Sequence, residues 1–107
     1  MKHWDVRYTK EAVNDRTALN TSARNQVDKA IRKVSQNPLP KSEGGYGTPL
    51  GSKRGNNLTG LYRIKLQKLG IRIVYKIIRE NKIMKIIVIA LRADDEVYEI
   101  AAKRNKH

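Results

Sequence analysis

The pattern of apolar and polar residues predicts a β-strand in four stretches of the chain, and strict alternation is clearest in the first two. The first runs from Trp4 to Tyr8, and the other three follow one another over residues 61–66, 71–78 and 83–91. The last of them is almost unbroken in Ile, Val and Met, as expected of a strand buried on both faces. Short polar turns separate these three strands, so we expect them to pair antiparallel as hairpins.

Apolar residues recur at helical spacing in other segments. Residues 10–19 predict a short helix capped by Thr9. Residues 23–35 predict a longer helix, which ends before Pro38 because proline cannot continue the hydrogen-bond ladder. A third helix is expected after Asp94 or Asp95, either of which can cap it. One stripe along this helix consists of Val97, Ile100, Ala101 and Arg104.

The order of these elements is β-α-α-β-β-β-α, which predicts an α+β fold. A mainly antiparallel four-stranded sheet would pack with two N-terminal helices and a short C-terminal helix, in a single domain over residues 1–107. Between the second helix and the next strand, residues 38–60 are rich in Gly, Pro, Ser, Asn and Thr and show no period, which predicts a long connection. The glycines of residues 45–51 read GxGxxxG, one residue too long for the dinucleotide fingerprint, and no predicted strand precedes them. We therefore expect no nucleotide cofactor.

Charge narrows the choice of partner. The chain has 107 residues, with 23 Lys and Arg against 10 Asp and Glu, a formal net charge of +13. Residues 61–91 alone hold eight basic and one acidic side chain. A surface this basic favours polyanions, above all nucleic acid. The chain has no apolar run long enough for a membrane span and no signal-peptide pattern, so we expect a soluble, cytoplasmic protein.

The residue inventory argues against a metal centre. There is no cysteine, and the two histidines, His3 and His107, stand at opposite ends of the chain. Four acids between Asp94 and Glu99 begin the last predicted helix, where capping and the helix dipole explain them better than a metal does.

A cationic surface is expected where the second and third predicted strands pair, since their polar positions then face one side. With the end of the last strand and the last helix, it draws on five side chains: Arg63, Lys65, Arg72, Arg92 and Tyr98. Lys76 shares the face of Arg72 and is a further candidate contact for phosphate. From the pattern alone, two interpretations stay open. The cations form a phosphate site with a phenol beside it, or they are ordinary solvent-facing residues and Tyr98 is a packing aromatic.

The segments around these residues resemble a known family. Residues 58–66 read LTGLYRIKL, residues 70–75 read GIRIVY, and Arg92 precedes Glu96-Val97-Tyr98. This combination resembles the RelE/ParE superfamily of bacterial type II toxins over nearly the whole chain. The RelE branch consists of small basic ribonucleases that enter the ribosomal A site and cut mRNA there, until a cognate antitoxin inhibits them. The ParE branch has the same fold, poisons DNA gyrase and usually lacks the RelE catalytic set.

The resemblance implies a role for each residue of the set. Lys65 and Arg72 would hold and stabilise the scissile phosphate. Arg92 corresponds to the arginine proposed as general acid, and Tyr98 to the tyrosine proposed as general base. Arg63 stands where the best-known member has lysine, which keeps the charge but changes its geometry. The Gly-rich stretch 44–57 is longer than in many members, so its role is open.

The full set favours the RelE branch. We expect a metal-independent endoribonuclease that cleaves mRNA in the A site of the small ribosomal subunit and has an acidic antitoxin as partner. Attack by the 2′-hydroxyl would leave a 2′,3′-cyclic phosphate and a 5′-hydroxyl, with the cations stabilising the charge that develops on the phosphoryl oxygens. Two alternatives are a ParE-like gyrase inhibitor and a basic RNA-binding module without activity. Arg92 and Tyr98 discriminate between them, because a binder has no need of a phenol beside the cations.

Overall fold

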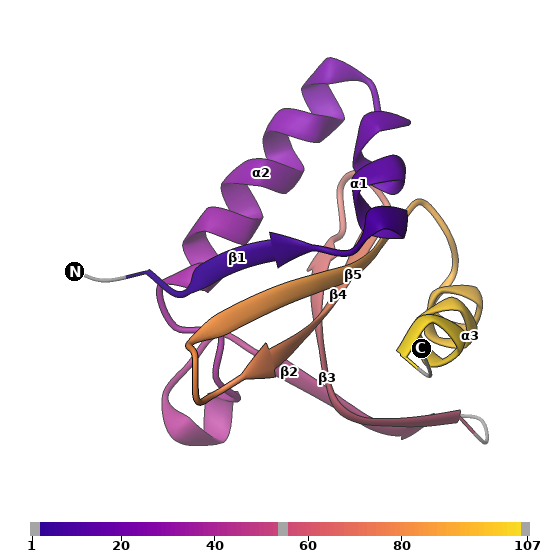
Figure 1. The fold of residues 1–107 in the computed structure, drawn as a ribbon. Coiled ribbons are helices and arrows are strands. Elements are labelled where there is room, and N and C mark those ends of the chain that lie inside the picture. The colour runs from indigo at the N-terminus through magenta and orange to yellow at the C-terminus, as the bar shows by residue number, and fades with distance from the viewer. Residues whose placement is uncertain (1–2, 54–55, 106–107) are drawn as a thin grey trace.

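A five-stranded sheet forms the centre of the molecule (Figure 1). The structure is a computed structural model that describes residues 3–53 and 56–105, so His107 lies outside it. The sheet has the order β1-β5-β4-β3-β2, in which β1 runs parallel to β5 and the other pairs are antiparallel. Its strands are β1 (Asp5–Tyr8), β2 (Thr48–Lys53), β3 (Asn56–Leu66), β4 (Ile71–Ile78) and β5 (Ile83–Ala90).

The helices divide between the two faces of this sheet (Figure 1). α1 (Lys10–Thr17) and α2 (Thr21–Ser35) cover one face, and α3 (Asp94–Asn105) covers the other. A short 3-10 helix, η1 (Lys41–Glu43), follows α2. The predicted α+β class and the mainly antiparallel sheet are thus confirmed.

Side-chain caps determine where the two N-terminal helices begin. The Thr9 hydroxyl accepts a hydrogen bond from the amide of Ala12 at 3.1 Å, as predicted. Asn20 does the same for Ala23 at 2.8 Å, so α2 begins at Thr21, earlier than its apolar spacing predicts. Residues 20–22, which the sequence leaves between the two predicted helices, are therefore a cap and the first turn of α2, because the Asn20 amide oxygen satisfies a free N–H there.

The predicted number of four strands is wrong, because the Gly-rich connection contains β2. This strand pairs antiparallel with β3, which itself begins at Asn56 and not at residue 61. The pairing slips between Pro49 and Gly51, and Gly51 has a φ of 64°. An edge strand needs hydrogen bonds on one side only, so it tolerates a proline and an irregularity that a central strand would not. Its composition therefore carries no strand signal.

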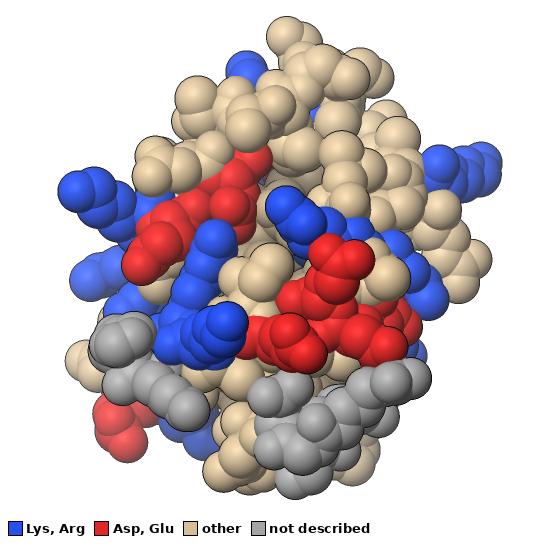
Figure 2. Space-filling view, turned by 90° about the vertical axis from the view of Figure 1, so that its right-hand side faces the viewer, with Lys and Arg blue, Asp and Glu red and all other residues tan. Residues whose placement is uncertain are grey.

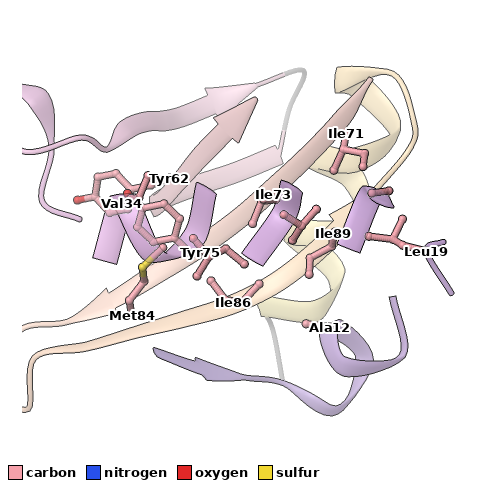
Figure 3. Packing of buried hydrophobic residues seen from close by; sticks show 13 residues of the cluster. Ala12, Leu19, Val34, Tyr62, Ile71, Ile73, Tyr75, Met84, Ile86 and Ile89 are labelled. Atoms are coloured by element: carbon pink, nitrogen blue, oxygen red, sulfur yellow. The ribbon is translucent and has the colours of Figure 1, made fainter. Parts of the chain in front are cut away.

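The larger part of the core lies between α2 and the sheet (Figure 3). Val27, Ile31 and Val34 line the helix face, at the spacing that predicted it. Tyr75 of β4 is fully buried here, and its hydroxyl donates a hydrogen bond to the carbonyl of Pro38 at 2.9 Å. Burial raises the pKa of Tyr75 well above its ordinary value. A Cβ on Gly47 would come within 2.7 Å of the same hydroxyl, so the connection after α2 packs against the sheet only with glycine there.

A second core lies under α3 and holds that helix in place. Val97, Tyr98 and Ala101 are buried against the other face of the sheet.

Polar contacts hold the far end of α3. Arg104 donates to Asp15 of α1 at 2.7 Å and to the carbonyl of Ile87 at 2.8 Å. Asp15 also accepts from the amide of Ile89 at 3.0 Å. The pairing of β1 with β5 ends at Ile86, so the ion pair satisfies backbone groups of β5 beyond the end of β1.

Arg104→Ala should therefore lower the free energy of unfolding by about 1–3 kcal/mol, because it leaves a half-buried carboxylate and a carbonyl without their donor. Urea denaturation measures this loss. Lys103→Ala, an exposed neighbour on the same helix, is the control and should change stability by less than about 0.5 kcal/mol. Equal losses in the two variants would contradict an anchoring role for Arg104.

Candidate functional site

Strand register brings three cations together on the face that α3 covers. Lys65 of β3 lies directly opposite Arg72 of β4, and Arg63 occupies the next row of the same face. The residues between them on β3 point to the α2 side, as the alternation predicts. We call Arg63, Lys65 and Arg72 the clamp.

One carboxylate stands at the centre of the clamp. The Arg72 Nε donates to Oδ1 of Asp94 at 2.5 Å, while Arg63 Nη1 and Lys65 Nζ each lie 3.9 Å from Oδ2. Burial alone would raise the pKa of Asp94, but the Arg72 hydrogen bond and the charges of all three cations outweigh it and hold this pKa below its usual value. Asp94 is thus an internal counter-ion of the clamp.

The sequence assigned Asp94 a different part. It was predicted, with Asp95, as a cap of the last helix, but α3 already begins at Asp94 and the Asp94 carboxylate bonds to Arg72. Its charge still suits the positive end of the helix dipole. The prediction was wrong for Asp94 because its partner is 22 residues away, beyond the reach of a local pattern.

Arg72 is the most firmly held of the three cations. Besides Asp94, its guanidinium donates to the carbonyls of Gly70 at 3.1 Å and Arg92 at 2.9 Å. Only 17% of its side chain is exposed. These bonds fix the plane of the guanidinium, which is the geometry that bidentate recognition of a phosphate requires.

The Tyr98 side chain is buried in the second core and also forms a hydrogen bond with the clamp. It lies one turn beyond Asp94 on α3, is 5% exposed, and packs in the second core. Its hydroxyl accepts a hydrogen bond from Arg63 Nη1 at 2.8 Å. Tyr98 is not in the stripe predicted for this helix, yet the structure buries its ring and places its hydroxyl oxygen against the clamp.

For two of the expected site residues, Arg92 and Lys76, the side chain forms no hydrogen bond or ion pair with the clamp in the described part of the chain. The Arg92 side chain is exposed and pairs with Glu96 at 3.1 Å, although the Arg92 carbonyl accepts from Arg72. Lys76 lies opposite Lys85 of β5, four residues along β4 from Arg72, roughly 13 Å away at the usual rise of a strand. Arg92 is therefore beside the clamp, and Lys76 belongs to a separate part of the same face.

Acidic and basic side chains lie side by side over this end of the molecule (Figure 2). Within the described ranges, no three His, Cys, Asp or Glu side chains are placed to hold a metal ion. In the same part of the chain, no helix is long and apolar enough to cross a membrane.

Comparison with known proteins identifies the family of this chain. The family described as ParE toxin of type II toxin-antitoxin system, parDE, matches residues 6–96. The chain therefore belongs to this family, within the RelE/ParE superfamily of type II toxins, as the sequence motifs predicted.

The relatives carry the RelE name. A RelE-like toxin protein of Escherichia coli is 27% identical over 101 residues, which cover 94% of this chain and 96% of the relative. The mRNA interferase toxin RelE of Escherichia coli K12 is 28% identical over 97 residues, covering 91% and 92%. Among solved structures, a variant of E. coli toxin RelE in the free state matches with a TM-score of 0.72 and 25% identity, covering 96% of this chain and 98% of that one. The intact E. coli RelBE toxin-antitoxin complex gives a TM-score of 0.66 at 22% identity, covering 84% and 98%.

Proposed function

We propose that this toxin is a metal-independent endoribonuclease that cleaves mRNA in the ribosomal A site, with its activity in one domain over residues 1–107. The observation that carries the proposal is the 2.8 Å hydrogen bond from Arg63 to the Tyr98 hydroxyl, which sets a phenol beside a three-cation clamp. Two relatives are named mRNA interferases, which supports the same activity.

In this mechanism the clamp receives the scissile phosphate. Tyr98 in its phenolate form takes the proton of the 2′-hydroxyl, whose oxygen attacks the adjacent phosphorus. The bond to the 5′-oxygen breaks, which leaves a 2′,3′-cyclic phosphate and a 5′-hydroxyl. Arg63, Lys65 and Arg72 stabilise the charge that builds on the phosphoryl oxygens. Arg92 stands at the rim, where it neutralises the leaving oxygen, and the proton comes either from it or from water.

The decisive experiment is primer extension on an mRNA under translation, with and without the purified toxin. We expect new stops inside the reading frame, unchanged by EDTA at a concentration that spares the ribosome, and fragments with 2′,3′-cyclic phosphate ends. Stops that vanish with EDTA on pre-assembled ribosome complexes would contradict metal independence. No stops at all would contradict the activity.

We also propose that an acidic antitoxin inhibits the protein in the cytoplasm, through a segment laid over the clamp or displacing α3. The formal net charge of +13 supports an acidic partner, which would gain association rate and specificity from it. Solved complexes of RelE relatives with RelB support the same assembly. Isolation of the native complex with a neutral or basic partner, bound away from the clamp, would contradict this.

A second candidate is gyrase inhibition, which the ParE description of the matching family favours. Gyrase inhibition would not require the hydroxyl oxygen of Tyr98. A supercoiling assay with purified gyrase separates the two candidates, since a gyrase poison would act there and leave the primer-extension pattern unchanged.

A further inference from the structure

The clamp is already occupied by an anion that belongs to the protein. All three of its cations form ion pairs with the Asp94 carboxylate, at 2.5 Å for Arg72 and 3.9 Å for the other two. Two carboxylate oxygens directed at a guanidinium and two further cations resemble two oxygens of a phosphodiester. A phosphate cannot take the Arg72 Nε donor while Asp94 holds it.

We propose that Asp94 is an internal stand-in for the scissile phosphate and that substrate binding replaces its carboxylate on the clamp. This rests on the proposed function, which makes the clamp a phosphate site. The exchange trades one anion for another, so a phosphate gains little from the clamp alone. Asp94 is therefore the residue that determines which anions the clamp admits.

Asp94 has an advantage over a free phosphate in the competition for the clamp. Because it belongs to the same chain, it competes as an intramolecular ligand, at the high effective concentration that a short link provides. Free phosphate or a short free RNA has to compete from solution. An mRNA that the ribosome already holds against the toxin competes on equal terms. We infer that Asp94 disfavours free RNA and selects a phosphate that another surface delivers.

The surroundings of Asp94 allow it to leave. The three residues before it, 91–93, are exposed, and 36% of its own side chain is exposed. Further along α3, Val97, Tyr98 and Ala101 are buried against the sheet, and Arg104 holds the far end of the helix. A rotation of the Asp94 side chain or a shift of the first turn frees the clamp, while Tyr98, one turn later, stays packed beside Arg63.

Asp94→Asn tests the proposal, because it removes the charge and keeps an oxygen that can accept from Arg72. Binding of inorganic phosphate, followed by NMR titration of the folded protein, should become at least about tenfold tighter, as expected for loss of one like charge next to the site. Cleavage of a free RNA oligonucleotide should rise relative to cleavage of ribosome-bound mRNA. Glu99→Gln makes the same charge change on an exposed position of α3 and should alter phosphate binding less than about twofold.

The outcomes separate this proposal from the proposed function. Unchanged or weaker phosphate binding in Asp94→Asn would overturn the stand-in role, whatever the toxin cleaves. Tighter phosphate binding together with loss of cleavage would also overturn it, because Asp94 would then act in the reaction itself. Absence of cleavage by the unaltered protein would refute the ribonuclease and leave the phosphate result standing. Melting temperatures are compared in parallel, and Asp94→Ser replaces Asp94→Asn if the amide does not fold.

Discussion

Tyr98→Phe should lower the rate of single-turnover cleavage of ribosome-bound mRNA by a factor on the order of 10²–10⁴, the usual contribution of a positioned general base. The ring stays in the second core, so the buried area is kept. The variant loses one hydrogen bond from Arg63, worth about 1 kcal/mol of stability. Binding to the ribosome should be unaffected, since the change removes one hydroxyl oxygen and none of the cations of the clamp.

The matched control is Tyr62→Phe. Tyr62 is buried to a similar degree, 8% exposed against 5% for Tyr98, but it faces the α2 side of the sheet and stacks on Tyr75. Removing its oxygen should leave the cleavage rate within about twofold of the starting value, as expected far from the reacting atoms. A folded Tyr98→Phe protein that cuts as fast as this control would exclude Tyr98 as the base, and water or Lys65 would then have to take the proton.

Arg72→Ala should reduce the cleavage rate by about 10²–10³, the loss seen when one preorganised donor to a developing charge is removed. Unlike the tyrosine change, it should also weaken the binding of mRNA, because the same guanidinium holds the phosphate before the reaction. Stability should fall as well, since Asp94 and the carbonyls of Gly70 and Arg92 lose a shared donor. Single-turnover rates at saturating and limiting toxin separate the effect on binding from the effect on chemistry.

Two further variants show what Arg72 contributes. Arg72→Lys keeps the positive charge but loses the planar guanidinium with its paired N–H donors. Compared with Arg72→Ala, it should therefore restore mRNA binding more than it restores the cleavage rate. Arg79 lies just beyond β4, pairs with Glu43 and is not part of the clamp. Arg79→Ala should therefore leave both mRNA binding and the cleavage rate unchanged. Equal behaviour of Arg72→Ala and Arg79→Ala would mean that only the overall charge matters, which is what a binding module without activity requires.

The expected effects depend on which cations share a face, and this could be predicted from the sequence. Side chains alternate along a strand, so Arg63 and Lys65 had to lie on one face, and a hairpin with a short turn had to bring Arg72 to them. The spacing of Val27, Ile31 and Val34 likewise predicted α2 and the face it buries. These properties follow from the geometry of single elements and tight turns, which neighbouring residues decide.

What the tertiary structure alone decided are the contacts between distant segments. Nothing near Asp94 in the sequence indicates that its carboxylate lies in the clamp, and Asp15 and Arg104, which hold α3, are 89 residues apart. The same holds for β2, whose pairing with β3 supplies the order that its Gly- and Pro-containing sequence lacks. Such contacts depend on how the chain closes over the whole sheet. For that reason the sequence was sufficient to predict the clamp, and the structure was needed to find the anion inside it.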